Sequence, residues 1–270
     1  MWEQVQETVS YSKEKIDFTP EYGVILGSGL GSFTDEIKVK YTLAYHEIPN
    51  FPVSTVQGQK GALIFGTIGT KNVVAMQGRF HFYEGYSMTE VTFPVRVMKF
   101  LGIEKLIVSN ASGGVNPSYK VGSIIMITDH INMTPEHPLR GKNDERFGPR
   151  FVNMSEPYSR KMIAKATELA KELNIEVHEG IYLGLQGPTY ETLAEYKMVK
   201  IVGADCVGMS TVPEVIVARH MDLETFGISV ITDMGNKESI GTISHEEVLE
   251  AAKGAEPKVR TLIRELILKY

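Results

Sequence analysis

Short apolar runs rich in valine and isoleucine recur along this 270-residue chain, and stretches with helical spacing lie between or after them. The runs predict buried strands at Val24–Leu26, Leu63–Phe65, Val73–Met76, Leu106–Val108, Ile124–Ile127, Ile181–Leu185 and Ile228–Ile231. Apolar residues three and four apart predict helices at Arg160–Leu173 and Val248–Leu268. This alternation is typical of an α/β fold, here with a mixed, largely parallel twisted β-sheet flanked by helices. No linker rich in Ser, Gly or Pro divides the chain, so we predict a single domain over residues 1–270.

The charge, the cysteine count and the apolar runs of the chain limit which partners, metal sites and locations are expected. The chain has 28 basic and 33 acidic residues and a net charge of −5, so we expect neither nucleic acid nor an anionic membrane as its partner. Its one cysteine, Cys206, excludes an intrachain disulfide and a cysteine-rich metal site, and the histidines show no metal-ligand spacing. No apolar run approaches the ~18 residues of a membrane span, and the N-terminal segment is polar. We therefore expect a cytoplasmic protein without a metal.

Four predicted helix starts carry a capping-box pattern, in which Glu follows Ser or Thr by three residues. They are Ser87–Glu90, Thr192–Glu195, Thr211–Glu214 and Ser244–Glu247. Ligands of parallel α/β sheets bind where strands end and helices begin, so the chemistry is expected near these points. The long polar segment Thr134–Arg150, interrupted by Pro and Gly, is predicted to be a lid or a binding loop.

The first candidate is the glycine-rich turn GSGLG at residues 27–31, which follows a predicted strand. Its glycines permit positive φ and close backbone approach, and Ser28 adds a hydroxyl donor, so the turn suits an anion such as phosphate. A tight strand-to-helix turn without a ligand is the alternative. A dinucleotide fingerprint does not fit, because Ser32 stands where the third glycine is needed.

The second candidate is the aromatic-rich segment QGRFHFYEGY at residues 77–86. If it is extended, Arg79, His81 and Tyr83 project to one face. A guanidinium beside an imidazole suits an oxyanion such as phosphate. Surface charge on an edge strand is the alternative explanation of Arg79.

Two further segments place polar groups at helix starts. Tyr190 and Glu191 come directly before one predicted capped helix, and Ser210 and Thr211 stand at the N-terminus of another. Unpaired amides at such a terminus favour an anion, although these hydroxyls could serve only as caps. Met209 beside them fits either core packing or the wall of a ligand site.

The remaining candidates lie at strand or helix ends. The predicted strand within residues 107–114 ends in the small residues SNASGG, which leave room and free amides at its carboxyl end. Asp233 ends a later strand, and His245 follows the presumed cap Ser244. Each of these two alone would be an ordinary polar residue; only their neighbours make them candidates.

Together these motifs resemble purine nucleoside phosphorylases of the homotrimeric type. The resemblance spans roughly residues 20–265 and rests on the ordered series GSGLG, QGRFHFYEGY, SNASGG, HPLRGKNDERFG, GPTYET, GMSTVPEVIVARH and SHEEV. It implies the nucleoside phosphorylase-like version of the predicted fold. It also implies phosphorolysis in purine salvage, in which a purine nucleoside and phosphate give the free base and α-(deoxy)ribose 1-phosphate. Inorganic phosphate is then a co-substrate, and no metal or organic cofactor is required.

The resemblance assigns roles by position. It implies that phosphate is bound by Ser28, Arg79, His81, the backbone amide of Ala111, and Ser210. It implies ribose contacts from Tyr83, Met209 and His245, and purine contacts from Tyr190, Glu191, Val207 and Asp233. His81, Glu191 and Asp233 are the implied catalytic groups. Phe151 matches a residue that closes the pocket of a neighbouring subunit in the trimer.

Two positions depart from the family pattern. Gln59 stands where a histidine near the phosphate is common, and a glutamine cannot carry charge; Lys60 is next to it. Asp233 stands where members selective for 6-oxopurines usually have asparagine. An ionised carboxylate only accepts hydrogen bonds, so it should repel O6 and favour a 6-amino group, whereas a protonated carboxyl could donate. Asn236 could occupy the position instead, because the local alignment loses two residues.

Three alternatives stay open at this point. Methylthioadenosine phosphorylase, a relative, uses an aspartate near the base, but Tyr83, Glu191 and His245 suit a ribose with a free 5′-hydroxyl. A nucleoside hydrolase would use carboxylates and water and would not need phosphate. A nucleoside-binding sensor would bind without turnover.

Overall fold

The structure is a computed structural model of the chain, and it describes residues 1–53, 61–235 and 245–270. Nine strands of the described residues form one sheet in the order β2-β3-β4-β1-β5-β8-β7-β6-β9. Their bounds are β1 Tyr22–Ile25, β2 Lys38–Ala44, β3 Ala62–Ile68, β4 Lys71–Gln77, β5 Lys105–Gly114, β6 Ile124–Asn132, β7 His178–Gly184, β8 Cys206–Gly208 and β9 Glu224–Met234. All seven predicted strands are thereby confirmed.

The sheet is mixed and closes on itself in one part. Parallel pairs include β1 with β4 and β5, β5 with β9, and β7 with β6 and β8. Antiparallel pairs join β2 to β3, β3 to β4, β5 to β8, and β6 to β9. Because β5 pairs with β9 as well as β8, the strands β5, β8, β7, β6 and β9 form a closed ring. A closed ring leaves these strands without unpaired edges.

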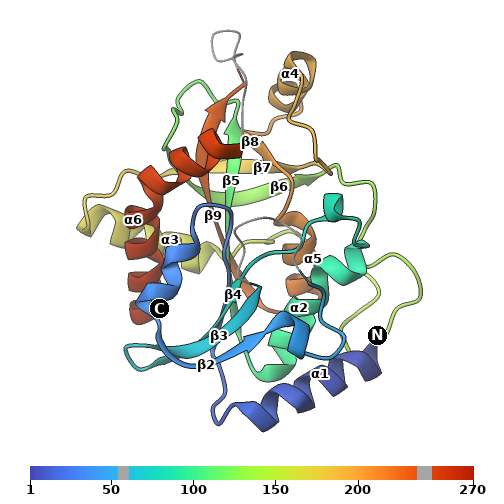
Figure 1. Cartoon of the computed structure of the whole chain (residues 1–270). Helices are drawn as coiled ribbons and strands as arrows, with labels where there is room; N and C mark the ends of the chain where they lie inside the picture. The colour runs from blue at the N-terminus through green and yellow to red at the C-terminus, as the bar shows by residue number, and fades with distance from the viewer. Residues whose placement is uncertain (54–60, 236–244) are drawn as a thin grey trace.

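Helices cover the sheet on both sides (Figure 1). The helices are α1 Trp2–Lys15, α2 Met88–Leu101, α3 Arg160–Glu172, α4 Leu193–Ile201, α5 Val212–His220 and α6 His245–Lys269. α3 packs on α6, and α6 packs on β9, whereas α2 packs on both α1 and α5. The predicted single-domain α/β class with a mixed sheet flanked by helices is confirmed, as are the two helices predicted from periodicity.

The predicted strands are buried mainly at their runs of apolar residues. β1 is buried along its length, and β3 and β9 are buried at nearly every position. The sequence reasoning missed β2 and β8. β2 has the sequence KVKYTLA, and most of its residues are exposed, as expected of an edge strand that carries lysines. β8 has only three residues.

Two of the four predicted capping boxes are confirmed. Ser87 accepts a hydrogen bond from the Glu90 amide, and Thr192 accepts one from the Glu195 amide, with the reciprocal bonds present in both cases. The box predicted at Thr211 is wrong, because Glu214 and the Thr211 hydroxyl both have other partners. The box at Ser244 lies outside the described residues.

Candidate active site

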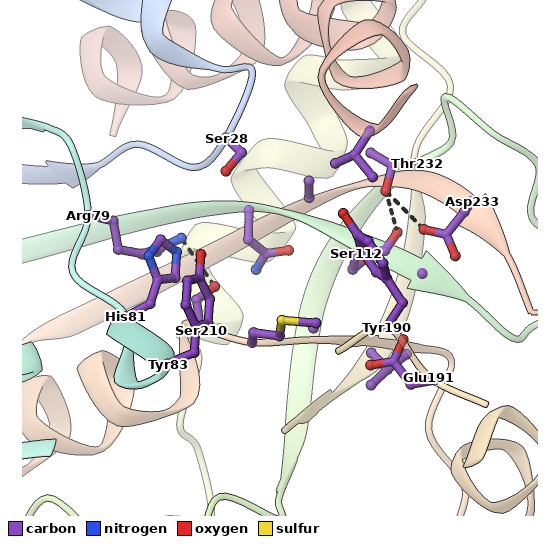
Figure 2. A pocket seen from close by; sticks show the side chains of 17 residues that line it. Ser28, Arg79, His81, Tyr83, Ser112, Tyr190, Glu191, Ser210, Thr232 and Asp233 are labelled. Carbon is purple, nitrogen blue, oxygen red and sulfur yellow. Dashed lines mark hydrogen bonds between the residues drawn. The ribbon is translucent and has the colours of Figure 1, made fainter. Parts of the chain in front are cut away.

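A pocket lies where several strands end and α5 begins. Its hollow measures about 660 Å³, including the part open to solvent. Figure 2 shows two groups of polar side chains in it. The arginine end holds Ser28, Arg79, His81 and Ser210, and the acidic end holds Tyr190, Glu191, Thr232 and Asp233. The full lining is Ser28, Arg79, His81, Tyr83, Asn110, Ala111, Ser112, Gly113, Tyr190, Glu191, Val207, Gly208, Met209, Ser210, Thr232, Asp233 and Val248.

The glycine-rich turn brings Ser28 into the pocket. A Cβ on Gly27 would lie 2.6 Å from the Asn110 Cα, so only glycine allows the turn to approach β5 this closely. Gly29 has a φ of +75°, which glycine adopts without strain. The Gly27 amide also donates to the Ser109 hydroxyl at 3.1 Å. The turn is therefore fixed against the strand whose end forms the pocket floor.

Arg79 is a buried cation, not a surface charge. Only 2% of the residue is exposed, and its Nε lies 2.8 Å from Oε1 of the equally buried Glu214. Its Nη1 donates to the Ser109 carbonyl at 2.7 Å and to the Ser210 hydroxyl at 3.2 Å. The edge-strand alternative for Arg79 is wrong, because the side chain is anchored on several sides at the pocket wall.

The capping box predicted at Thr211 is wrong because both of its side chains have other partners. Glu214 pairs with Arg79, and the Thr211 hydroxyl accepts from Asn110 Nδ2 at 2.8 Å. Thr211 has φ 71° and ψ −54°, and the Val212 amide donates to the Ser210 carbonyl at 2.7 Å. This geometry is a strained γ-turn. It turns the chain sharply between Ser210 and α5, so that the Ser210 hydroxyl lies at the pocket.

His81 and Tyr83 reach the pocket by a different route than the predicted extended chain. β4 ends at Gln77, and a 3₁₀ helix, η3 Phe82–Glu84, follows His81. The His81 Nδ1 lies 3.0 Å from the Glu84 carboxylate, which also accepts from the His81 amide. The rings of His81 and Tyr83 are stacked with centroids 4.6 Å apart. The imidazole is thus held from one side by a carboxylate and from the other by an aromatic ring.

A buried chain of hydrogen bonds lies beneath the pocket floor. Ser229 donates to Asn110 Oδ1 at 2.6 Å, and the Ser112 hydroxyl lies 2.6 Å from that of Ser229. Asn110 joins this pair to Thr211 at the arginine end. The sequence reasoning quoted the motif that contains Asn110 but gave the residue no role. Its buried amide needs both partners, so it fixes the strand end that carries Ala111.

A bulge places two consecutive residues of β9 on the pocket. Ser112 pairs with Ile231, whereas Gly113 pairs with Asp233, so Thr232 is the extra residue. In a regular strand, neighbouring side chains point to opposite faces. The bulge removes that alternation, and both Thr232 and Asp233 line the pocket (Figure 2).

The acidic end concentrates negative charge in a half-buried place. Burial raises the pKa of the Glu191 carboxyl, and the nearby Asp233 adds to the rise. Burial, followed by Asp233 and Glu191, also raises the pKa of Tyr190. At the other side of the pocket, burial raises the pKa of Tyr83 to about 12. These two tyrosines are therefore neutral donors near pH 7.

One implied site residue lies away from this pocket. Phe151 is 88% exposed and lies on the wall of a second hollow, beside Arg150 and Met154. His245 begins α6, and its side chain lies outside the described residues, as do Gln59, Lys60 and Asn236. The segment Thr134–Arg150 has no helix or strand, as predicted, but it does not contribute to the described pocket lining.

Cys206 is buried in β8, as predicted for a small packed side chain. Among the residues that the structure describes, no three His, Cys, Asp or Glu side chains are grouped to hold a metal ion. None of the helices in the described ranges has the length and apolar character needed to cross a membrane.

Comparison with known proteins gives one consistent result. Residues 21–268 match the model of the phosphorylase superfamily. The chain is 46% identical over 270 residues to purine nucleoside phosphorylase 1 of Bacillus subtilis (strain 168), with all of both chains covered. The chain belongs to the purine nucleoside phosphorylase family. The family expected from the ordered motifs is therefore confirmed.

Solved structures of this family share the whole fold. A structure of isoform 2 of purine nucleoside phosphorylase from Schistosoma mansoni, in complex with cytosine and ribose-1-phosphate, matches with a TM-score of 0.95 and 39% identity over 99% of this chain and 96% of that one. A second structure, of Schistosoma mansoni purine nucleoside phosphorylase in complex with adenosine, matches with a TM-score of 0.94 and 42% identity over 99% and 97%. The similarity covers almost the whole of each chain, so the overall fold described above is the fold of these purine nucleoside phosphorylases.

Proposed function

We propose that the pocket binds phosphate at its arginine end and the purine at its acidic end. The chain is a purine nucleoside phosphorylase, a pentosyltransferase that converts a purine nucleoside and phosphate to the free base and (deoxy)ribose 1-phosphate. The observation that carries the placement is the separation of the two ends in one hollow, with a buried cation at one and carboxylates at the other. The relatives' name favours this activity over the methylthioadenosine and hydrolase alternatives.

Phosphate binding is assigned to Arg79, His81, Ser28, Ser210 and the amide of Ala111. Arg79 is already oriented by Glu214, so little side-chain entropy is lost when a dianion binds. The guanidinium and the hydroxyls supply charge-assisted hydrogen bonds to phosphate oxygens.

Ribose and base fill the middle and the acidic end. Tyr83 and Met209 line the stretch between the two ends, and the resemblance adds His245 as the contact of the 5′-hydroxyl. Tyr190 and Val207 offer apolar surfaces to the purine ring. Glu191 accepts from the donor edge of a 6-oxopurine when it is ionised.

The chemistry uses the two ends together. Cleavage of the glycosidic bond puts positive charge on the sugar, and a phosphate dianion beneath the ring stabilises that charge as it attacks the anomeric carbon. The configuration at that carbon inverts. His81 helps to hold the phosphate, while Glu191 and Asp233 meet the base as negative charge develops on its imidazole ring. This scheme needs no metal or organic cofactor.

We assign the exposed Phe151 to the pocket of a neighbouring copy in a homotrimer. The side chain is 88% exposed beside a hollow, so it is accessible to a second copy of the chain. Phe151→Ala should raise the KM for nucleoside and leave the KM for phosphate nearly unchanged, and light scattering should give the mass of a trimer. A monomeric mass, or an unchanged nucleoside KM, would remove the assignment. The cytoplasmic location stays a prediction of the sequence.

The deciding experiment measures base release from inosine, guanosine and adenosine, each with and without phosphate. Release should require phosphate for all substrates that react. Reaction of all three would support Asp233 as a determinant that admits adenosine. Reaction of inosine and guanosine alone would leave the activity in place and remove that role, whereas release without phosphate would overturn the mechanism.

A further inference from the structure

Tyr196, which does not line the pocket, donates a short hydrogen bond into its acidic end. Its hydroxyl lies 2.7 Å from Oδ2 of Asp233. The tyrosine belongs to α4, is only 4% exposed, and reaches Asp233 across a gap that two glycines leave open. A Cβ on Gly235 would lie 2.2 Å from the Tyr196 ring, and one on Gly113 would lie 3.1 Å from its hydroxyl. The position of this hydroxyl is therefore fixed by packing.

The other oxygen of Asp233 has a weaker donor. The Thr232 hydroxyl lies 3.2 Å from Oδ1, but it also lies 3.3 Å from the Ser112 carbonyl (Figure 2). A hydroxyl has one proton, so Thr232 divides it between two acceptors. Tyr196 has the shorter contact, and it is the donor that determines how the carboxylate is oriented.

The hydroxyl of Tyr196 acts as a donor throughout the neutral range. Burial, followed by the charge of Asp233, raises the pKa of Tyr196 far above its ordinary value, so the proton stays on the phenol. Among the described residues, Asp233 interacts with the titratable groups Tyr190, Glu191 and Tyr196. The two printed hydrogen bonds of its carboxylate come from the hydroxyls of Tyr196 and Thr232.

We infer that Tyr196 is a positioning residue that orients the Asp233 carboxylate as a hydrogen-bond acceptor and thereby favours 6-aminopurine nucleosides over 6-oxopurine nucleosides. This inference rests on the proposed placement of the base at the acidic end. An acceptor-only carboxylate binds the exocyclic N–H of adenosine and repels the O6 of inosine. Without the phenol, the carboxylate loses its best donor and its fixed direction, and both changes weaken the preference.

The test compares kcat/KM for adenosine and inosine in the wild type, Tyr196→Phe, Asp233→Asn and the double variant. Tyr196→Phe keeps the ring and removes one hydrogen bond to a charged group, so we expect the adenosine-to-inosine ratio to fall about tenfold. The fall should appear mainly with adenosine, in the KM. In the Asp233→Asn background the same substitution should change the ratio less than about twofold, since coupled residues give non-additive effects.

A matched control is Tyr119→Phe. Tyr119 is also buried and its hydroxyl also donates at 2.8 Å, but to the Glu179 carbonyl, and it does not line the pocket. The substitution Tyr119→Phe should leave the adenosine-to-inosine ratio of kcat/KM unchanged. The ratio is measured on one preparation of each variant, so a general loss of folded enzyme lowers both activities and cancels.

The outcomes separate this inference from the proposed function. If Asp233→Asn lowers the ratio and Tyr196→Phe leaves it unchanged, or lowers both activities in parallel, the role of Tyr196 is overturned and the placement of the base stands. If Asp233→Asn leaves the ratio unchanged, Asp233 is not the base contact, and both ideas fail. A fall with each single variant and no further fall in the double variant supports the inference.

Discussion

The substitution Glu214→Gln tests the anchoring of the buried guanidinium at the arginine end. It keeps the size of the side chain and removes the charge 2.8 Å from Arg79 Nε, where both residues are 2% exposed. Breaking a buried ion pair by removing one partner typically costs about 3–5 kcal/mol, because the remaining charge has no counter-ion. At about 2–4 °C per kcal/mol for a chain of this size, the melting temperature should fall by roughly 6–20 °C. Arg79 then keeps its contacts with Ser109 and Ser210 but loses the carboxylate that orients its guanidinium, so the KM for phosphate should also rise, by about tenfold.

The assay is chemical and thermal unfolding in phosphate-free buffer, with Glu172→Gln as the control. Glu172 pairs with Lys269 at 3.5 Å, but both side chains are about half exposed, so its loss should cost about 0–1 kcal/mol. Phosphate is left out because a ligand of the folded state stabilises by mass action and would hide part of the loss. If the free energy of unfolding of Glu214→Gln differs from that of the control by less than about 1 kcal/mol, the Arg79–Glu214 pair does not stabilise the fold as a buried ion pair.

Three further predictions concern other parts of the site. Burial raises the pKa of Glu191 in the folded state, so the folded protein binds more protons than the unfolded one and loses stability as pH rises through that interval. Glu191→Gln should therefore raise the melting temperature at pH 7, with no gain below about pH 4. The same substitution should abolish most activity on inosine. An unchanged or lower melting temperature at pH 7 would contradict the destabilising effect of the buried carboxyl. Asn110→Ala leaves the buried partners of the amide unsatisfied and should lower the free energy of unfolding by about 1–3 kcal/mol in urea titrations, so a loss within error would show that these bonds are dispensable. Gly29→Ala forces a φ of +75° on alanine, so it should lower the free energy of unfolding by about 1–2 kcal/mol and raise the KM for phosphate. The control Gly31→Ala, with no atom within 4 Å of its Cβ, should do neither. Equal effects of the two substitutions would contradict the role of the turn.

Local sequence was sufficient for seven of the nine strands in the described residues, for the family and for most of the pocket residues. Short runs rich in Val and Ile favour buried strands, so strands such as β1 and β9 could be predicted, and their alternation with helices gives the α/β class. Of the residues assigned a role from the ordered motifs, eleven line the pocket: Ser28, Arg79, His81, Tyr83, Ala111, Tyr190, Glu191, Val207, Met209, Ser210 and Asp233. Their roles came from resemblance, because spacing alone left a tight turn or a cap as an alternative explanation.

The tertiary structure decided how those residues act on one another. Glu214 fits the pattern of a cap in the sequence, yet it pairs with Arg79, because α5 starts in a γ-turn beside the end of β4. The route of the aromatic segment changed too, since η3 replaces an extended chain at Tyr83. Each outcome depends on a partner more than a hundred residues away or on a turn that periodicity does not reveal.

At the acidic end, the contributions of the sequence and of the tertiary structure can be separated most clearly. The sequence determined that a carboxylate stands at position 233 and that a helix follows Thr192. Only the tertiary structure decided that a bulge faces Thr232 and Asp233 to one pocket and that Tyr196 reaches the carboxylate between two glycines. The physical reason is that local patterns set which side chains are buried, whereas hydrogen bonds between distant segments depend on strand register and helix placement, which are fixed when the whole core packs.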